Sequence, residues 1–311
     1  MGRKSAFAAA AGAGILAVAG VIGGNKLYRR VVVPKARPEN EPDFSEQVTK
    51  GRLFVRNHPG HQDVYLEAID LLKLHGIYIE SDAPGAGEKY AILVHGYNDH
   101  AESMGIFAEE YLKRGFHVLL PDLRGYGKSE GNYVGFGYDD RLDILEWIYW
   151  ILRRDKGARI ILHGCSMGAA TVLMTAGEHL PEAVKAVVAD SSYSTVKDEF
   201  AHVIASSGDS PLPFALTYAL LRLETRIRAG YDMNDCSPLR AVGRASVPIL
   251  FLHGEADRLI PVDMATTLYM QAKTPKYMET FAGADHIRCV VTDPERYYGA
   301  VDGLLEEVSL L

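Results

Sequence analysis

One pentapeptide in the middle of this 311-residue chain restricts its fold more than any other feature. It reads Gly164-Cys165-Ser166-Met167-Gly168, directly after an apolar run and directly before a helical segment. A strand, a sharp turn and a helix in this order lift a serine hydroxyl above the end of a sheet, and the turn has room only for small residues two before and two after the serine. Such a pentapeptide also arises by chance, so its placement carries the argument. The pattern predicts Ser166 as a nucleophile.

Short apolar runs alternate with longer amphipathic segments along the rest of the chain. Five runs have the length and nearly continuous apolar character of strands buried on both faces. They lie at 91–94, 117–120, 159–162, 184–189 and 249–252. Helical spacing occupies 102–114, 139–154, 167–179, 262–271 and about 294–308. This pattern predicts an α/β fold, with a mainly parallel sheet covered by helices on both faces, and it puts Ser166 at the third parallel strand end.

One insertion interrupts this alternation. More than fifty residues separate the strand that ends near Asp190 from the strand that begins near Pro248, and they include the apolar run 214–223. A simple crossover between neighbouring strands needs far fewer residues. We therefore predict a helical cap at about 192–246, inserted before the strand that carries the catalytic acid. A peripheral insertion without contact to substrate is the alternative.

A nucleophilic serine needs two partners. Its hydroxyl is a poor nucleophile at neutral pH unless a base accepts the proton, and an acid must hold that base in the right tautomer. Asp257 follows the apolar run 248–253 and is the predicted acid, with Glu255 and Asp190 as alternatives. His286 follows the next predicted strand, 277–281, and is the predicted base. The predicted catalytic residues are Ser166, Asp257 and His286.

Attack by serine places negative charge on the substrate carbonyl oxygen, so two backbone N–H groups must already point at it. The residue after the nucleophile, Met167, supplies one of them. The loop after the first parallel strand, residues 95–100, supplies the other through Tyr97, because Gly96 permits a close approach. Further on, Asp122 is expected to fix the turn of its own loop.

The N-terminal region differs in composition from the rest. No charged residue occurs from Ser5 to Asn25, which is about the length that spans a bilayer as a helix. We predict an anchor at 1–33 that attaches the protein to a membrane, on a side that the flanking charges leave open. A secretory signal cleaved near residues 17–19 and a disordered tail are the alternatives. Residues 34–50, rich in proline and acids, are the predicted linker, and 51–311 the catalytic domain.

Charge and cysteine content exclude other classes of function. The net charge is -7 and no basic stripe occurs in the globular part, so we expect no nucleic-acid partner. Cys165, Cys236 and Cys289 are too few and too scattered for a disulfide framework, and none has metal-ligand spacing with histidine. The predicted chemistry requires neither a metal nor an organic cofactor.

Together, the loop at 95–96, the loop at 122–129, the Ser166 turn, the Asp257 turn and His286 resemble the α/β-hydrolase superfamily over roughly residues 70–310. Within it, the chain resembles bacterial hydrolases with an N-terminal hydrophobic segment, grouped with serine aminopeptidases and monoacylglycerol-lipase-like esterases. The resemblance implies hydrolysis of a carboxylic ester or amide without a cofactor. The apolar cap and the anchor favour a small acyl ester or lipid-like substrate. The alternatives are an aminopeptidase-type amide hydrolase, an acyltransferase and a non-catalytic binding module on the same fold.

Overall fold

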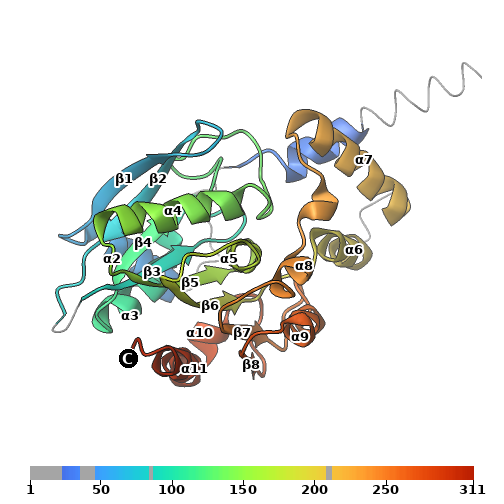
Figure 1. Cartoon of the computed structure of the whole chain (residues 1–311). Coiled ribbons are helices and arrows are strands. Elements are labelled where there is room, and N and C mark those ends of the chain that lie inside the picture. The colour runs from blue at the N-terminus through green and yellow to red at the C-terminus, as the bar shows by residue number, and fades with distance from the viewer. Residues whose placement is uncertain (1–22, 36–45, 84–86, 208–211) are drawn as a thin grey trace, which may run out of the picture.

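A computed structural model describes residues 23–35, 46–83, 87–207 and 212–311 of the chain. Its centre is an eight-stranded sheet with the order β1-β2-β4-β3-β5-β6-β7-β8 (Figure 1). The strands are β1 (Gln62–Glu67), β2 (Lys73–Ile79), β3 (Lys89–Val94), β4 (His117–Pro121), β5 (Arg159–Cys165), β6 (Val184–Asp190), β7 (Ile249–Gly254) and β8 (Lys276–Phe281). From β4 to β8 all neighbours are parallel. The predicted mainly parallel sheet is confirmed, and every predicted strand is present.

Helices cover both faces of the sheet. They are η1 (Ala101–Met104), α3 (Gly105–Lys113), α4 (Asp140–Arg154), α5 (Met167–Ala176), α9 (Val262–Gln271), α10 (Cys289–Thr292) and α11 (Pro294–Glu307). Alternate residues of β5 bury themselves on opposite faces: Ile160 and Leu162 pack with α4 and α5, and Ile161 packs with α3 and α11. This two-sided burial explains why the strand is apolar throughout.

The two antiparallel strands, β1 and β2, were not predicted from the sequence. β1 lies at the sheet edge, where its only hydrogen-bonded neighbour is β2. Among its six residues only Leu66 is fully buried. An edge strand of this kind lacks the continuous apolar run by which buried parallel strands are recognised.

Between β6 and β7 the chain forms a largely helical segment. It contains α6 (Val196–Ser207), α7 (Phe214–Arg228), η2 (Met233–Asp235) and α8 (Pro238–Val242). Figure 1 shows α6 and α7 at one end of the molecule, beside a helical stretch at residues 23–31. The Arg228 guanidinium lies 5.1 Å from the ring centre of Tyr28, so this stretch packs against α7. We call the segment from α6 to α8 the cap.

A helix begins inside the predicted linker. Helix α2 (Glu46–Asn57) occupies residues 46–50 of the predicted linker, and residues 36–45 lie outside the described residues. The helix packs closely on the start of α3, because a Cβ on Gly105 would overlap the backbone carbonyl of Gly51. Only Gly51 and Val55 of α2 are fully buried. Because so few of its residues are buried, α2 shows almost no apolar periodicity in the sequence.

The predicted anchor at 1–33 falls mostly on residues 1–22, which lie outside the described residues. Among the helices that the structure does describe, none combines the length and the apolar character needed to cross a membrane. Attachment to a membrane therefore stays a prediction.

Candidate active site

The predicted nucleophile occupies the turn between β5 and α5. Ser166 has φ 55° and ψ −120°, a backbone conformation that non-glycine residues seldom adopt. Its N–H donates a 2.8 Å hydrogen bond to the carbonyl of Asp190, at the end of the neighbouring strand. A Cβ at Gly168 would overlap the backbone carbonyl of Val94, and one at Gly164 would overlap that of Gly168. Backbone packing therefore requires both glycines around the serine.

Loops after β7 and β8 bring two predicted residues to this serine. His286 Nε2 lies 2.9 Å from Ser166 Oγ, and His286 Nδ1 lies 2.7 Å from Asp257 Oδ2. When Nδ1 carries the ring proton, it donates to Asp257 and leaves Nε2 free to accept the serine proton. The structure thus joins the three residues in one chain of hydrogen bonds, although they are far apart in sequence. Their catalytic roles stay predictions.

Asp257 is held in the ionised form. Its Oδ1 accepts the backbone N–H groups of Leu259 and Ile260 at 2.9 and 2.8 Å. Burial disfavours the charge, but hydrogen bonds from His253 and His286 outweigh it and hold the pKa of the Asp257 carboxyl well below its usual range. An ionised carboxylate at this position can stabilise a protonated imidazole.

Neither alternative acid makes a hydrogen bond to His286. Glu255 accepts from the Thr280 hydroxyl at 2.7 Å. Asp190 accepts from the hydroxyls of Ser191 and Tyr297, at 2.8 and 2.9 Å. Burial raises the pKa of the Asp190 carboxyl. The geometry therefore favours Asp257 among the three acids considered.

The two backbone groups predicted to bind the oxyanion belong to segments that flank Ser166. Met167 is the first residue of α5, where a backbone N–H has no partner within the helix. Gly96 lies against the nucleophile, since a Cβ added there would be 3.3 Å from Ser166 Cβ. The next residue, Tyr97, donates its phenol proton to the Val31 carbonyl at 2.9 Å, which directs its side chain toward the N-terminal helical stretch. The oxyanion role of both N–H groups stays a prediction.

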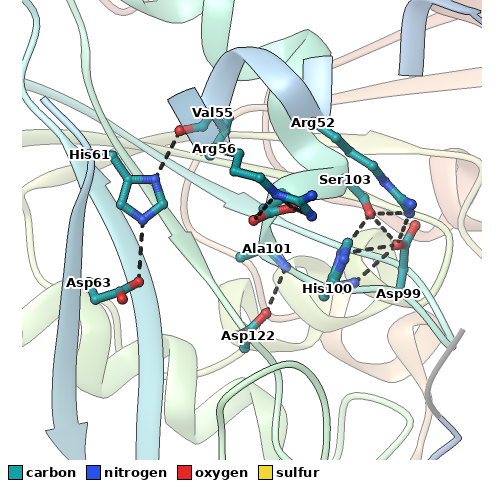
Figure 2. A network of polar contacts seen from close by, with 11 residues as sticks. Arg52, Val55, Arg56, His61, Asp63, Asp99, His100, Ala101, Ser103 and Asp122 are labelled. Atoms are coloured by element: carbon teal, nitrogen blue, oxygen red, sulfur yellow. Dashed lines mark hydrogen bonds and ion pairs between the residues drawn. The ribbon is translucent and has the colours of Figure 1, made fainter. Parts of the chain in front are cut away.

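Helix α2 fixes the loop that carries Tyr97. Figure 2 shows Arg52 with its Nη2 between Asp99 Oδ1 and Ser103 Oγ, at 2.7 Å from each. One helical turn later, Arg56 Nη2 pairs with Glu102 Oε2 at 2.6 Å. These contacts were not predicted from the sequence, because the partners of Arg52 and Arg56 lie more than 40 residues away along the chain. The spacing of the two arginines, four residues apart, is the only local signal for them.

Asp122 joins this loop to the one after β4. Its Oδ1 accepts the N–H of Ala101 at 2.7 Å, also drawn in Figure 2, and its Oδ2 accepts the N–H of Lys128 at 2.8 Å. His75 Nδ1 lies 2.6 Å from the same Oδ2. The bond to Lys128 confirms that Asp122 fixes the turn of its own loop, and the other two connect that loop to neighbouring elements.

The cap and the loop before α4 add side chains near the site that were not predicted from the sequence. The ring of Phe136 stacks on Tyr97, with centroids 5.9 Å apart. Phe200 of α6 meets Phe136 edge-on, also at 5.9 Å. The preceding residue, Glu199, has a buried Oε2 with no hydrogen-bond partner among the described residues. No local pattern could show which face of α6 lies toward Tyr97.

The described part of the chain contains no candidate metal site. No cluster there brings together three or more His, Cys, Asp or Glu residues in a way that could hold a metal ion. The thiols of Cys165, Cys236 and Cys289 are buried. Burial raises the pKa of the Cys165 thiol well above its usual value, which disfavours the thiolate next to the nucleophile.

Comparisons with known proteins agree with this architecture. Residues 92–208 match the family model of the alpha/beta hydrolase fold. The uncharacterized protein YqkD of Bacillus subtilis is 24% identical over 228 residues, which cover 73% of this chain and 74% of YqkD.

Among solved structures, the esterase Pf2001 of Pyrococcus furiosus is similar with a TM-score of 0.66 and 23% identity, over 88% of this chain and 98% of the esterase. The acylaminoacyl peptidase of Pyrococcus horikoshii is similar with a TM-score of 0.58 and 20% identity, over 82% of this chain and 43% of the peptidase. At these identities the likeness shows a shared fold. The sheet topology, the family match and this shared fold show that the chain has the alpha/beta hydrolase fold, and they support its membership of the α/β-hydrolase superfamily.

Proposed function

We propose that this protein is a serine hydrolase that cleaves a carboxylic ester of a small acyl or lipid-like substrate through an acyl-enzyme intermediate. The observation that carries the proposal is the continuous chain of hydrogen bonds from Asp257 through His286 to Ser166, at 2.7 and 2.9 Å. This arrangement activates a serine hydroxyl at neutral pH. The strained turn supports the same role, because it presents the serine at the start of a helix.

The reaction proceeds in two halves. Ser166 Oγ attacks the ester carbonyl carbon while His286 Nε2 takes its proton; the bond to the alcohol oxygen then breaks, and His286 returns the proton to the departing alcohol. A water molecule next attacks the acyl-enzyme and gives a proton to His286. The acyl–Ser166 bond breaks, the acid leaves, and His286 restores the proton to Ser166.

One fixed charge and two backbone N–H donors lower the barriers of these steps. The ionised Asp257 stabilises the imidazolium that forms on His286 in each half. The N–H groups of Tyr97 and Met167 would stabilise the tetrahedral oxyanion, and removal of one such donor typically costs about 100- to 1,000-fold in kcat. The rings of Tyr97, Phe136 and Phe200 contact one another in that order, from the oxyanion loop to the cap. This aromatic surface supports the proposal that the acyl group of the substrate is apolar.

A p-nitrophenyl ester series of increasing acyl length tests the proposal in the full-length protein. We expect hydrolysis to peak at one acyl length and Ser166→Ala to abolish it, together with labelling by a fluorophosphonate probe. Ser246→Ala is the matched control, since Ser246 is exposed and precedes β7 at the strand end opposite the site. Equal hydrolysis by wild type and Ser166→Ala would refute the assignment of the nucleophile. A protein that neither hydrolyses any ester nor reacts with the probe would instead match a non-catalytic module.

A further inference from the structure

Helix α6 carries a carboxyl group for which the mechanism above has no use. Glu199 Oε2 is buried, and no described residue forms a hydrogen bond with it. The neighbouring Asp198 differs, because it accepts from the hydroxyls of Ser194 and Thr195 at 2.9 and 2.7 Å near the start of the helix. Burial of a carboxyl without a partner costs free energy, so native proteins rarely tolerate it without a functional reason.

The position of Glu199 relates it to the catalytic acid. His202, three residues later and on the same side of α6, has its Nε2 2.9 Å from the carbonyl oxygen of Arg258, the residue after Asp257. That face of α6 therefore lies over the loop that carries Asp257. Burial, and then the negative charge of Asp257, raise the pKa of the Glu199 carboxyl to about 8. The negative charge of Asp257 therefore disfavours ionisation of Glu199.

The surroundings of Glu199 lack a positive charge to balance it. Burial and the Asp257 carboxylate are the influences on its pKa, and no Lys, Arg or His among the described residues lowers it. The next residue, Phe200, directs its ring to Phe136, which in turn stacks on Tyr97 of the oxyanion loop. The carboxyl therefore lies where the cap meets both the catalytic acid and the apolar side of the site. A cation placed there would satisfy it.

We propose that Glu199 is a specificity-determining residue that binds a protonated amine of the substrate, so that the preferred ester carries an ammonium group a few bonds from the scissile carbonyl. The inference rests on the proposed ester hydrolysis. An ammonium group donates charge-assisted hydrogen bonds, which are stronger than neutral ones, and it supplies the missing partner of Oε2. A site built around a buried polar group discriminates strongly against substrates that leave that group unpaired.

Matched pairs of esters test this inference. One pair carries the charge in the alcohol, 3-aminopropyl against butyl hexanoate; the other carries it in the acyl group, p-nitrophenyl 6-aminohexanoate against heptanoate. In wild-type protein at pH 7.5, we expect kcat/KM for the ammonium ester to exceed that for the neutral ester in at least one pair. Glu199→Gln keeps the shape of the side chain but cannot form the carboxylate that a bound ammonium group would stabilise. We expect it to reduce that ratio by about 10- to 100-fold, mainly through KM, as loss of a charged hydrogen bond does.

Two further variants make the test specific. Lys197→Gln removes a charge from an exposed residue of the same helix and should leave the ratio unchanged. Glu199→Asp keeps the charge and should retain part of the preference. Equal ratios in wild type and Glu199→Gln would overturn the inference, and so would an equal loss of both esters of a pair, which would mean that Glu199 acts through the triad. If the proposed function itself is wrong, the neutral esters and the fluorophosphonate probe fail as well.

Discussion

Replacement of Asp257 by asparagine tests the candidate triad most sharply, because the structure dictates how the new side chain must orient. Oδ1 of Asp257 accepts two backbone N–H groups, from Leu259 and Ile260. An asparagine keeps both bonds only if its carbonyl oxygen takes the Oδ1 position. The opposite orientation would put an NH₂ group against two N–H donors and lose both bonds.

The amide nitrogen then occupies the position of Oδ2, 2.7 Å from His286 Nδ1 in the native protein. Because that nitrogen is a donor, Nδ1 must become the acceptor, and the ring proton moves to Nε2. In this tautomer Nε2 can no longer take the proton of Ser166. We expect Asp257→Asn to lower kcat by about 10⁴-fold, as the same exchange does in other Ser-His-Asp enzymes. This corresponds to about 5 kcal/mol of transition-state stabilisation.

Initial rates on the best p-nitrophenyl ester and the rate of fluorophosphonate labelling measure the effect. Asp285→Asn is the matched control: Asp285 is exposed, and its Oδ1 accepts the backbone N–H of His286 at 2.8 Å, a bond that asparagine preserves. We expect it to change kcat by less than about threefold, because the charge that is lost is exposed to solvent. A loss below tenfold in a folded Asp257→Asn protein would refute the assigned role of Asp257.

Two predictions concern stability. Gly168→Ala should lower the free energy of unfolding by about 2–4 kcal/mol in urea denaturation, because the new Cβ would overlap the Val94 carbonyl. Gly299 is exposed on α11, and a Cβ added there would meet nothing within 4 Å. Gly299→Ala should therefore raise the free energy of unfolding by about 0.5–1 kcal/mol. Equal changes in the free energy of unfolding of the two variants would contradict the packing of Gly168 against Val94. Burial raises the pKa of Asp140 from 3.8 to about 7, so the folded state favours the protonated carboxyl more than the unfolded state does. The resulting stabilisation of the folded state is fully present below pH 4 and is lost as the pH rises through 7. Asp140→Asn should make this decline shallower by up to about 1.4 kcal/mol per pH unit, and an unchanged slope in unfolding measurements would contradict that pKa.

The sequence by itself determined the parallel part of the fold and the place of the predicted nucleophile. Buried strands such as β5 are apolar on both faces, and the Ser166 turn has a local steric requirement, so both leave signals within a few consecutive residues. Asp257 and His286 were found by their positions after successive strands. Parallel strands end at one edge of the sheet, and their order along the chain therefore indicated which loops would meet.

Only the tertiary structure decided the contacts between segments that have no regular relation in sequence. It showed that Arg52 of α2 holds the predicted oxyanion loop through Asp99, and that α6 of the cap, which carries Glu199, contacts the loop of Asp257 through His202. Neither residue belongs to a motif, because each acts through a partner far away in sequence. A charged residue on an amphipathic helix has the same local pattern whether it meets water or a site. The packing of the whole chain decides which of the two it meets.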